Sequence, residues 1–484
     1  DANDGLTPGT PLRTIEAGKD LMRDGMPDWL LLKRGTVFYD RIGSWDKSGR
    51  SASEPMIITG YGSNSARPRL LTGNETGIGI FSGDHVNNFV ISGIHFEAHT
   101  YDGISNHIVG LLVLETGSNH LYEDCVFKNY TDNIVLQAGG VGLRNVVIRR
   151  TLVLDAFRVG VPWGKSQGMF ASGVHGLLIE ECIFDHNGWS EEHPSAPANI
   201  FSHNIYISNT CSDVVVRRSI LTEASSHGLQ LRPGGVITDN LVVRNPIGIL
   251  AGGGDSPNSG GVTATVTGNI VLEGVDIGPG YPRGFGIDLK NLKSALVADN
   301  IVANKISATG GFFSIGKSVS GGPEGIGVRN TTIENNIIHN WRSPVYFNNN
   351  CLNVVVRNNV IQDPAIPDSR GLTNTYTTNP AEVSFSSNTY HSDTTDDEWF
   401  HIDWQAMPTQ QWRTDFESSL ELREIQFDEP SRSMGTYAGS LGLTATHDAL
   451  MAQVRTQSRS NWRTEYSIDV LLTYFRNGFK ESSP

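Results

Sequence analysis

The chain has 484 residues, of which 53 are glycine and 38% are hydrophobic. A chain of this length and apolar content can bury a sizeable core, so disorder is excluded and either several domains or one large repetitive body is expected. Acidic residues outnumber basic residues by 14, which argues against a nucleic-acid partner because such binding draws on basic side chains. The longest apolar runs fall well short of the about 20 residues that a membrane-spanning helix needs, so no membrane span is predicted.

Residues 1–28 are predicted to form an N-terminal cap. The segment PLRTIEAGKDLMRD at 11–24 places Leu12, Ile15, Leu21 and Met22 on roughly one face of a helix, and Thr10 could cap its N-terminus. A solenoid exposes strand edges at its ends, so a helix at this position would cover the first coil.

One pattern recurs through residues 29–392 and decides the fold class. It consists of a β-branched or aliphatic strand, two polar positions, a small or amide residue and two further apolar residues, as in VVRRSIL at 215–221 and LVADNIV at 296–302. Its copies lie about 29 residues apart on average, much farther than the strands of a β-hairpin. The small or amide positions are Gly93, Cys125, Thr151, Cys182, Ser219, Asn240, Asn269, Asn300, Asn336, Asn359 and Asn388.

Each copy therefore corresponds to one full coil of a solenoid. A single coil cannot bury its apolar face, but coils stacked about 4.8 Å apart bury a continuous core and pair each strand in parallel with the next coil. We predict an all-β fold, a right-handed parallel β-helix, in which the repeated asparagines form an inward hydrogen-bonded ladder. A β-sandwich or a propeller is the alternative, and the irregular spacing of the copies argues against propeller blades.

The four cysteines are predicted to be free thiols without a catalytic role. Cys125 and Cys182 occupy the repeated inward position two coils apart, about 9–10 Å, which exceeds the span of a disulfide. Cys211 and Cys351 lie in turns that are several coils from each other. No pair has the CxxC spacing of a zinc or redox site.

Residues 393–484 differ in composition and are predicted to be a helical extension that packs on the end or flank of the solenoid. Helical spacing of apolar residues is clearest in the segments 447–459 and 462–479. Aromatic side chains serve packing more often than sugar binding, so a packing role is expected for the tryptophans of this region, Trp399, Trp404, Trp412 and Trp462.

The repeat, together with the opening DANDGLTPGTPLRTIEAGKDL, resembles the pectate-lyase-like right-handed parallel β-helix superfamily of carbohydrate-active proteins. The resemblance implies this fold over about residues 29–390 and a carbohydrate ligand. It leaves the chemistry open, because the superfamily contains polysaccharide lyases, glycoside hydrolases, uronate epimerases and phage tailspikes. The opening is similar to the N-terminal caps of exported members and starts at Asp1 without a methionine, so a secreted or periplasmic protein is expected. The protein is also expected to be a monomer.

No cofactor or metal is predicted. The carboxylate-rich calcium cluster of pectate lyases and the DPH motif of alginate epimerases are both missing from the sequence. The segment DANDG at residues 1–5 has a weak likeness to a cation loop, which keeps calcium as an alternative, but a turn at a frayed terminus is the simpler interpretation.

A candidate site follows from a second apolar strand in each coil. Aliphatic residues alternate with residues of other types in HNIYIS at 203–208, HGLQLR at 227–232, IGILAG at 247–252 and FGIDLK at 285–290. The aliphatic side chains should face the core, so the side chains between them should point outward in columns across adjacent coils. Two neighbouring strands begin with histidine, His203 and His227. The expected outward columns are Tyr206, Gln230, Leu250 and Asp288, and beside them Ser208, Arg232, Gly252 and Lys290.

Further contacts with a substrate are expected from the strand start at Asn204 and from the segment DHNGW at 185–189. That segment could form a wall over the same sheet, and its tryptophan could either stack on a sugar ring or pack within the loop. The residues assigned to substrate binding are His186, Asn187, Trp189, Asn204, Gln230 and Asp288.

The outward side chains fit the eliminative cleavage of a uronic-acid polymer such as alginate. That reaction needs a group that neutralises a carboxylate, a base for the proton beside it and an acid for the leaving oxygen. Arg232 and Lys290 would neutralise the carboxylate. His203 or His227 would be the base, and Tyr206 would be the acid or the alternative base. The predicted function is that of a polysaccharide lyase with an anionic polysaccharide as its partner.

Two alternatives to the lyase are kept. A glycoside hydrolase needs two carboxyl groups about 5 to 9.5 Å apart, and Asp288 would need Asp185, Glu223 or Asp255 as its partner. A carbohydrate-binding adhesin without catalysis would have a groove richer in exposed aromatic side chains.

Overall fold

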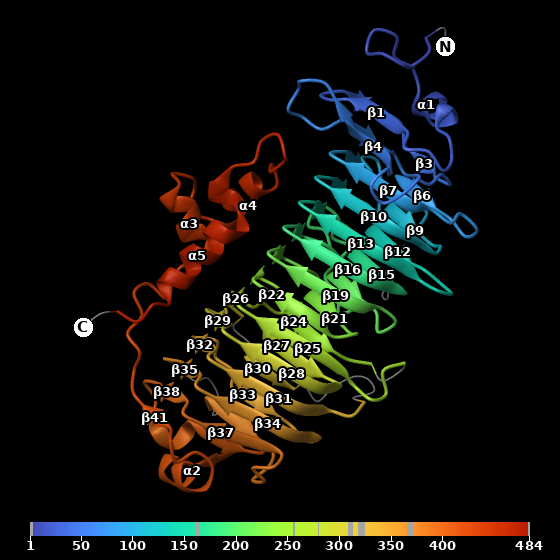
Figure 1. Cartoon of the computed structure of the whole chain (residues 1–484). Helices are drawn as coiled ribbons and strands as arrows, with labels where there is room; N and C mark the ends of the chain where they lie inside the picture. The colour runs from blue at the N-terminus through green and yellow to red at the C-terminus, as the bar shows by residue number, and fades with distance from the viewer. Residues whose placement is uncertain are drawn as a thin grey trace. The chain divides into compact units, whose positions relative to one another are not determined.

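The computed structural model describes residues 3–160, 165–254, 257–278, 280–307, 313–317, 325–364 and 371–482. The chain divides into two compact units, which are residues 1–197, 210–213 and 458–462, and residues 198–209, 214–457 and 463–484. Both units consist of stacked coils in which the strands run side by side (Figure 1). The strands form three sheets, named A, B and C here, and successive coils add one strand to each sheet in turn.

In the first unit, helix α1 (Ile15–Leu21) precedes the coils. Sheet A contains β1 (Trp29–Lys33), β4 (Met56–Tyr61), β7 (Asn87–Ser92), β10 (Gly117–Glu123), β13 (Leu143–Arg149) and β16 (Val174–Glu180). Sheet B contains β2 (Val37–Phe38), β5 (Arg69–Leu71), β8 (His95–Glu97), β11 (Val126–Lys128), β14 (Leu152–Leu154) and β17 (Ile183–Asp185). Sheet C contains β3 (Gly43–Ser44), β6 (Ile78–Ile80), β9 (Val109–Val113), β12 (Asp132–Gln137) and β15 (Gln167–Ser172).

In the second unit, sheet A contains β19 (Ser212–Arg217), whose first two residues are assigned to the first unit, β22 (Gly235–Thr238), β25 (Val262–Thr267), β28 (Leu292–Ala298), β31 (Val328–Glu334), β34 (Cys351–Arg357) and β37 (Val383–Ser386). Sheet B contains β20 (Ile220–Thr222), β23 (Leu241–Val243), β26 (Ile270–Leu272), β29 (Ile301–Ala303), β32 (Ile337–His339), β35 (Val360–Gln362), β38 (Thr389–His391) and β41 (Glu421–Leu422). Sheet C contains β18 (His203–Ile207), β21 (His227–Leu231), β24 (Ile247–Gly252), β27 (Phe285–Lys290), β30 (Ile315–Lys317), β33 (Val345–Phe347), β36 (Thr373–Thr375), β39 (Phe400–Ile402) and β40 (Gln405–Met407).

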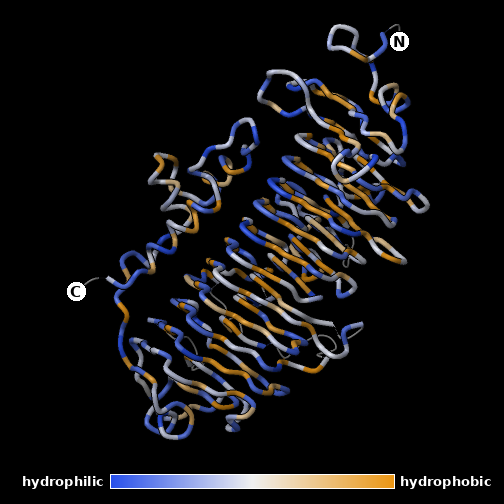
Figure 2. The backbone as a smooth tube through the Cα atoms, in the orientation of Figure 1, coloured by the Kyte–Doolittle hydropathy of each residue, from blue (hydrophilic) through white to orange (hydrophobic). Residues whose placement is uncertain are grey.

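Successive coils pair in parallel, as the repeat predicts. Within the second unit, for example, Val236 lies opposite Thr265 and Ile237 lies opposite Val266. Figure 2 shows the alternation of hydrophobic and hydrophilic positions along the strands that buries one face of each sheet. The strand pairing continues past residue 392, because β39 pairs in parallel with β36, and it ends in an antiparallel hairpin between β39 and β40.

The predicted asparagine ladder is present and fully hydrogen-bonded. The side-chain amide of Asn240 donates to Oδ1 of Asn269 at 3.0 Å and to the backbone oxygen of Val216 at 3.0 Å, and the same arrangement repeats from Asn269 to Asn300. A residue in the left-handed conformation precedes the ladder position in each of these coils, such as Asp239 with φ 53°. This residue turns the chain from sheet A into sheet B and directs the next side chain inward.

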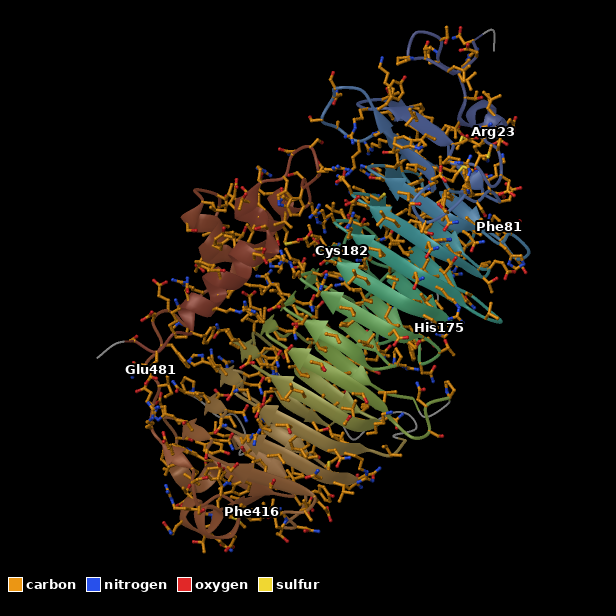
Figure 3. The ribbon with its side chains drawn as sticks, in the orientation of Figure 1. Arg23, Phe81, His175, Cys182, Phe416 and Glu481 are labelled. Atoms are coloured by element: carbon orange, nitrogen blue, oxygen red, sulfur yellow. The ribbon has the colours of Figure 1, made fainter. Side chains whose placement is uncertain are left out.

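The four cysteines are buried free thiols, as predicted. Cys182 lies on the first unit, where Figure 3 labels it, and its thiol donates to the backbone oxygen of Ile148 at 3.4 Å. Burial raises the pKa of Cys125 and of Cys182 to about 12, so both remain protonated and unreactive.

Helix α1 is shorter than the sequence pattern predicts, and its N-cap is Thr14 instead of Thr10. The Thr14 side chain accepts a hydrogen bond from the backbone N–H of Ala17, which satisfies a free donor of the first turn. Ile15 is buried, but Leu21 is 56% exposed because the helix ends at this residue.

The C-terminal region contains the 3-10 helices η1 (Asp396–Glu398) and η2 (Thr464–Tyr466), and the α-helices α2 (Thr409–Asp415), α3 (Met434–Ser440), α4 (His447–Val454) and α5 (Ile468–Gly478). Helix α5 lies along the coil edge in the second unit: Asp469 pairs with Arg218 at 2.6 Å, and Arg476 donates to the backbone oxygen of Gly268 at 2.7 Å. Among the described residues, no helix has the length and hydropathy of a membrane span.

Candidate active site

Four neighbouring strands of sheet C in the second unit, β18, β21, β24 and β27, carry the candidate site. Tyr206 lies opposite Gln230, and Gln230 lies opposite Leu250, which in turn lies opposite Asp288. The intervening side chains, such as Ile205 and Leu229, are completely buried in the core. The column predicted from period-2 alternation is therefore in register, but Gln230, Leu250 and Asp288 are only 6%, 5% and 2% exposed.

The two histidines at the strand starts lie side by side. His203 is opposite His227, and their ring centroids are 4.7 Å apart. The ring of His203 is also 5.2 Å from that of Tyr206, so the three side chains form one continuous cluster. Both histidines are only 5% exposed.

A serine next to His227 fixes the protonation pattern of its ring. The Ser226 hydroxyl donates to the backbone oxygen of Ser202 at 2.7 Å, and its oxygen lies 3.0 Å from Nδ1 of His227. Because the single hydroxyl proton is used toward Ser202, Nδ1 of His227 is the donor in the second contact. The lone pair of the neutral ring is then on Nε2, the nitrogen that a general base needs.

His227 is neutral at pH 7. Burial is the largest cause that lowers the pKa of His227 well below its ordinary value of 6.5, and the charges of His203, Lys290, Arg232 and Arg283 lower it further. A neutral imidazole among cations can accept a proton from a substrate whose negative charge those cations attract.

Two cationic side chains, Arg232 and Lys290, lie near His203 and His227. The Arg232 guanidinium lies over the Tyr206 ring, 5.0 Å from its centroid, and Nζ of Lys290 is 3.7 Å from Oδ2 of Asp288. Gly252 lies opposite Lys290 with φ 82°, and a Cβ atom there would approach the backbone oxygen of Lys290 to 1.9 Å. The strand between the two cations therefore carries no side chain at this position.

Gln230 presents a free acceptor in the same column. Its side chain is 6% exposed, and its Oε1 atom has no hydrogen-bond partner among the described residues. A buried amide oxygen without a donor is rare in folded proteins, and a sugar hydroxyl would satisfy it.

Arg283 is a further cation near the site that the strand pattern of the sequence does not predict. It lies in the connection between β26 and β27, where its guanidinium is 4.9 Å from the Tyr281 ring centroid and 5.7 Å from that of Phe285. Its backbone N–H donates to Oδ1 of Asp276 at 2.7 Å. The signal that could have found it is the arginine between two aromatics in the segment YPRGF at 281–285.

Asn204 and Asn187 do not belong to the outward columns. Both are completely buried, and their amides donate to backbone oxygens, from Asn204 to Thr222 at 2.8 Å and from Asn187 to Val153 at 2.9 Å. Asn133 donates to Oδ1 of Asn187 at 2.9 Å, which forms a second amide ladder in the first unit. We therefore no longer assign either asparagine to substrate binding.

His186 and Trp189 lie in the first unit and contact each other. Their ring centroids are 4.3 Å apart in an edge arrangement, and Nδ1 of His186 is 3.3 Å from Oδ1 of Asp155. Their part in substrate binding stays a prediction.

The carboxylates considered for a hydrolase are distributed over different sheets. Asp288 is on β27 of sheet C, whereas Glu223 follows β20 of sheet B and Asp185 ends β17 of sheet B in the first unit. Asp255 lies outside the described residues. Within the outward columns of β18, β21, β24 and β27, Asp288 is the one carboxylate.

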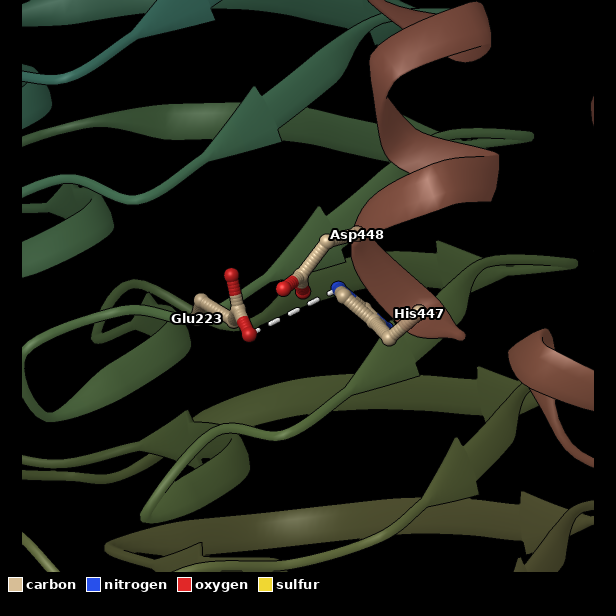
Figure 4. Close-up of side chains that lie close together, drawn as sticks. All are labelled: Glu223, His447 and Asp448. Carbon is tan, nitrogen blue, oxygen red and sulfur yellow. Dashed lines mark ion pairs between the residues drawn. The ribbon is translucent and has the colours of Figure 1, made fainter. Parts of the chain in front are cut away.

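Glu223, His447 and Asp448 form the group that could hold a metal ion in the described part of the chain, with one ligand-type atom from each within 4.8 Å of the others (Figure 4). The Arg244 guanidinium already lies 3.5 Å from Glu223, 4.0 Å from Asp448 and 2.8 Å from Glu273. A protein cation therefore neutralises this cluster, which joins α4 to sheet B.

Comparisons with known proteins agree with the parallel β-helix described above. The family model described as "Right handed beta helix region" matches residues 104–271. No curated protein sequence matches the chain.

Among solved structures, a mannuronic acid specific polysaccharide family 6 lyase from human gut microbiota is 12% identical, with a TM-score of 0.51, and the match covers 96% of this chain and 97% of that one. The PL6 family alginate lyase AlyGC is 15% identical, with a TM-score of 0.47 and coverage of 86% of this chain and 53% of that one. The chain thus spans about half the length of AlyGC. Pectate lyase Pel9A is 17% identical, with a TM-score of 0.36 and coverage of 64% and 76%. At the level of the fold, the chain is a right-handed parallel β-helix, as its repeat predicts.

Proposed function

We propose that the protein is a polysaccharide lyase that cleaves a uronic-acid-containing polysaccharide, such as alginate, by β-elimination. The observation that carries the proposal is the neutral His227, whose pKa is lowered by burial and by the nearby cationic side chains of Lys290, Arg232 and Arg283. An eliminative site needs this combination, because the base must stay unprotonated while the cations neutralise the carboxylate next to the acidic proton.

The proposed reaction needs three functions, which are neutralisation of the carboxylate, a base and an acid. Arg232 and Lys290 bind the carboxylate and stabilise the negative charge that develops on it, with Arg283 as a third cation. Nε2 of His227 removes the proton from the carbon beside the carboxylate, a carbon–carbon double bond forms, and the bond to the glycosidic oxygen breaks. Tyr206 donates a proton to the leaving oxygen. His203 orients Tyr206, and its own ring is a second imidazole next to the base His227.

Gln230 and Asp288 have supporting roles in this proposal. The free Oε1 of Gln230 accepts a hydrogen bond from a sugar hydroxyl. Asp288 holds Lys290 in place through the 3.7 Å ion pair. The wider proposal is a secreted or periplasmic monomer that acts on an anionic polymer without a metal cofactor.

The decisive experiment is incubation of the protein with alginate, pectate, glucuronan and glycosaminoglycans while ultraviolet absorbance is followed. A lyase generates an unsaturated uronate chromophore. New reducing ends without the chromophore would identify a hydrolase instead. If none of the polymers gained new ends, the protein would be a carbohydrate-binding protein without catalytic activity.

A further inference from the structure

The hairpin between β39 and β40 carries a large aromatic residue in an unfavourable backbone position. Ile402 pairs with Gln405, so the turn consists of Asp403 and Trp404 alone. Both have positive φ, 48° and 64°. A two-residue turn with this geometry strongly favours glycine at its second position, and a bulky residue there is strained.

This turn lies on the sheet that carries the proposed catalytic side chains. Asp288 is opposite Gly316, and Gly316 is opposite Tyr346, so Tyr346 belongs to the same column two strands, or about 10 Å, farther along. The Trp404 ring lies on Tyr346, with centroids 5.0 Å apart and an angle of 33°. Gly316 leaves the column without a side chain between Asp288 and the two rings.

Trp404 is much more exposed than Trp399 and Trp412. Trp399 and Trp412 are 6% and 0% exposed and serve packing, as expected, whereas Trp404 is 39% exposed and covers Tyr346, which is 5% exposed. One part of the indole therefore rests on a protein ring while the rest meets solvent. Packing alone does not explain why an exposed residue is a strained tryptophan, and residues held in strained conformations cluster at ligand sites.

We propose that Trp404, supported by Tyr346, is a sugar-stacking platform that binds the anionic polysaccharide two or more sugar rings away from the point of cleavage. The inference rests on the proposed function for the identity of the polymer. A sugar ring is about as long as the spacing between coils, so a chain that lies along the sheet from Asp288 reaches the platform after a few units. The apolar face of a pyranose stacks on an indole, and the free part of Trp404 offers that surface.

Trp404→Gly is the sharpest test, because it deletes the ring and creates the Asp-Gly pair that this turn favours. The variant should be at least as stable to heat as the parent protein. In affinity gels that contain the substrate polysaccharide, retardation of the variant should be lost, or about tenfold more polysaccharide should be needed to produce it. This change corresponds to the loss of one stacking contact. Trp404→Phe should recover part of the retardation.

Trp462→Ala is the matched control, because Trp462 is also 39% exposed and lies in the first unit, near Arg150. Kinetics add a second measurement: Trp404→Gly should raise KM for the polymer about tenfold and leave KM for a trisaccharide within about twofold. Equal gel retardation of Trp404→Gly and Trp462→Ala would overturn the platform, as would a wild-type protein that no polymer retards. Retardation that depends on Trp404 without cleavage of the polymer would uphold the platform and reject the lyase.

Discussion

Glu417 ends the asparagine ladder by accepting two hydrogen bonds from Asn388. Its Oε1 lies 2.9 Å from the backbone nitrogen and 2.9 Å from the side-chain nitrogen of Asn388, in the place where a further asparagine would stand in another coil. Its Oε2 accepts from Tyr390 at 2.9 Å and from Trp412 at 3.4 Å. The residue thus caps an internal network that would otherwise present unpaired donors.

The first prediction concerns this cap. Glu417→Ala removes the acceptor for four buried donors, and we expect the free energy of unfolding to fall by about 3 kcal/mol, because each donor loses its partner without gaining water. Glu417→Gln keeps the oxygen that faces Asn388 and should cost about 1 kcal/mol. Urea unfolding followed by fluorescence measures both, and Glu424→Ala, at an exposed position, is the control. A Glu417→Ala variant as stable as this control would show that the ladder needs no cap.

The second prediction concerns the base. His227→Ala should lower kcat at least about hundredfold, the usual contribution of a general base. Ser226→Ala should lower kcat about tenfold at neutral pH, since Nδ1 of His227 loses the acceptor that keeps the lone pair on Nε2.

Asp288→Asn provides the contrasting variant for the same assay. On the proposed mechanism it loosens Lys290 and mainly raises KM. If Asp288→Asn abolished turnover while His227→Ala and His203→Ala stayed near wild type, a carboxylate-based hydrolase would be the better interpretation.

The third prediction concerns the carboxylate-binding cations. Arg232→Ala should reduce kcat/KM about hundredfold, because a bound carboxylate would be left without its charged partner. Arg149→Ala is the matched control: Arg149 is a partly exposed arginine on sheet A whose partner is Glu123, at 2.7 Å. Comparable kcat/KM values for the two variants would place the substrate on another face of the coils.

The fourth prediction concerns acid stability. Burial lowers the pKa of His120 and of His339 to about 4, and burial with the charges of Arg244 and Arg455 lowers that of His447 to about 3. Since the folded pKa lies below the unfolded pKa of about 6.5, the unfolded state binds protons more readily. Stability is therefore complete above about pH 6.5 and falls with decreasing pH, by about 1.4 kcal/mol per pH unit for each histidine until its folded pKa is reached.

His339 and His447 link this effect to the C-terminal region. The His339 ring contacts the rings of Phe427 and Phe479, with centroids 5.7 Å from each, and His447 begins helix α4. Thermal unfolding between pH 8 and pH 4 should show a falling midpoint, and His447→Gln should flatten this dependence. A midpoint that stayed constant down to pH 4 would contradict the assignment of these histidines as neutral in the folded state.

Much of the architecture is determined by the sequence itself, because it depends on local periodicity. The spacing of the apolar residues decides where strands form, and the repeated Asn240, Asn269 and Asn300 mark the bend at which a side chain turns inward. The same alternation places Tyr206, Gln230 and Asp288 on one outward column, since period 2 holds wherever a strand is regular.

Only the tertiary structure determined the side-chain positions that depend on bends of the chain and on contacts between distant segments. Asn204 and Ile205 are consecutive and both completely buried, so the alternation fails at the strand start, where the chain turns between sheets. The tautomer of His227 depends on where the Ser226 hydroxyl proton goes, and the charge of Arg283, in the connection between β26 and β27, lowers the pKa of His227. Trp404 lies on Tyr346 although 57 positions separate them in the sequence, since coil stacking brings distant segments into contact. Contacts of this kind leave no local pattern, because they are fixed by the packing of whole coils and not by the order of neighbouring residues.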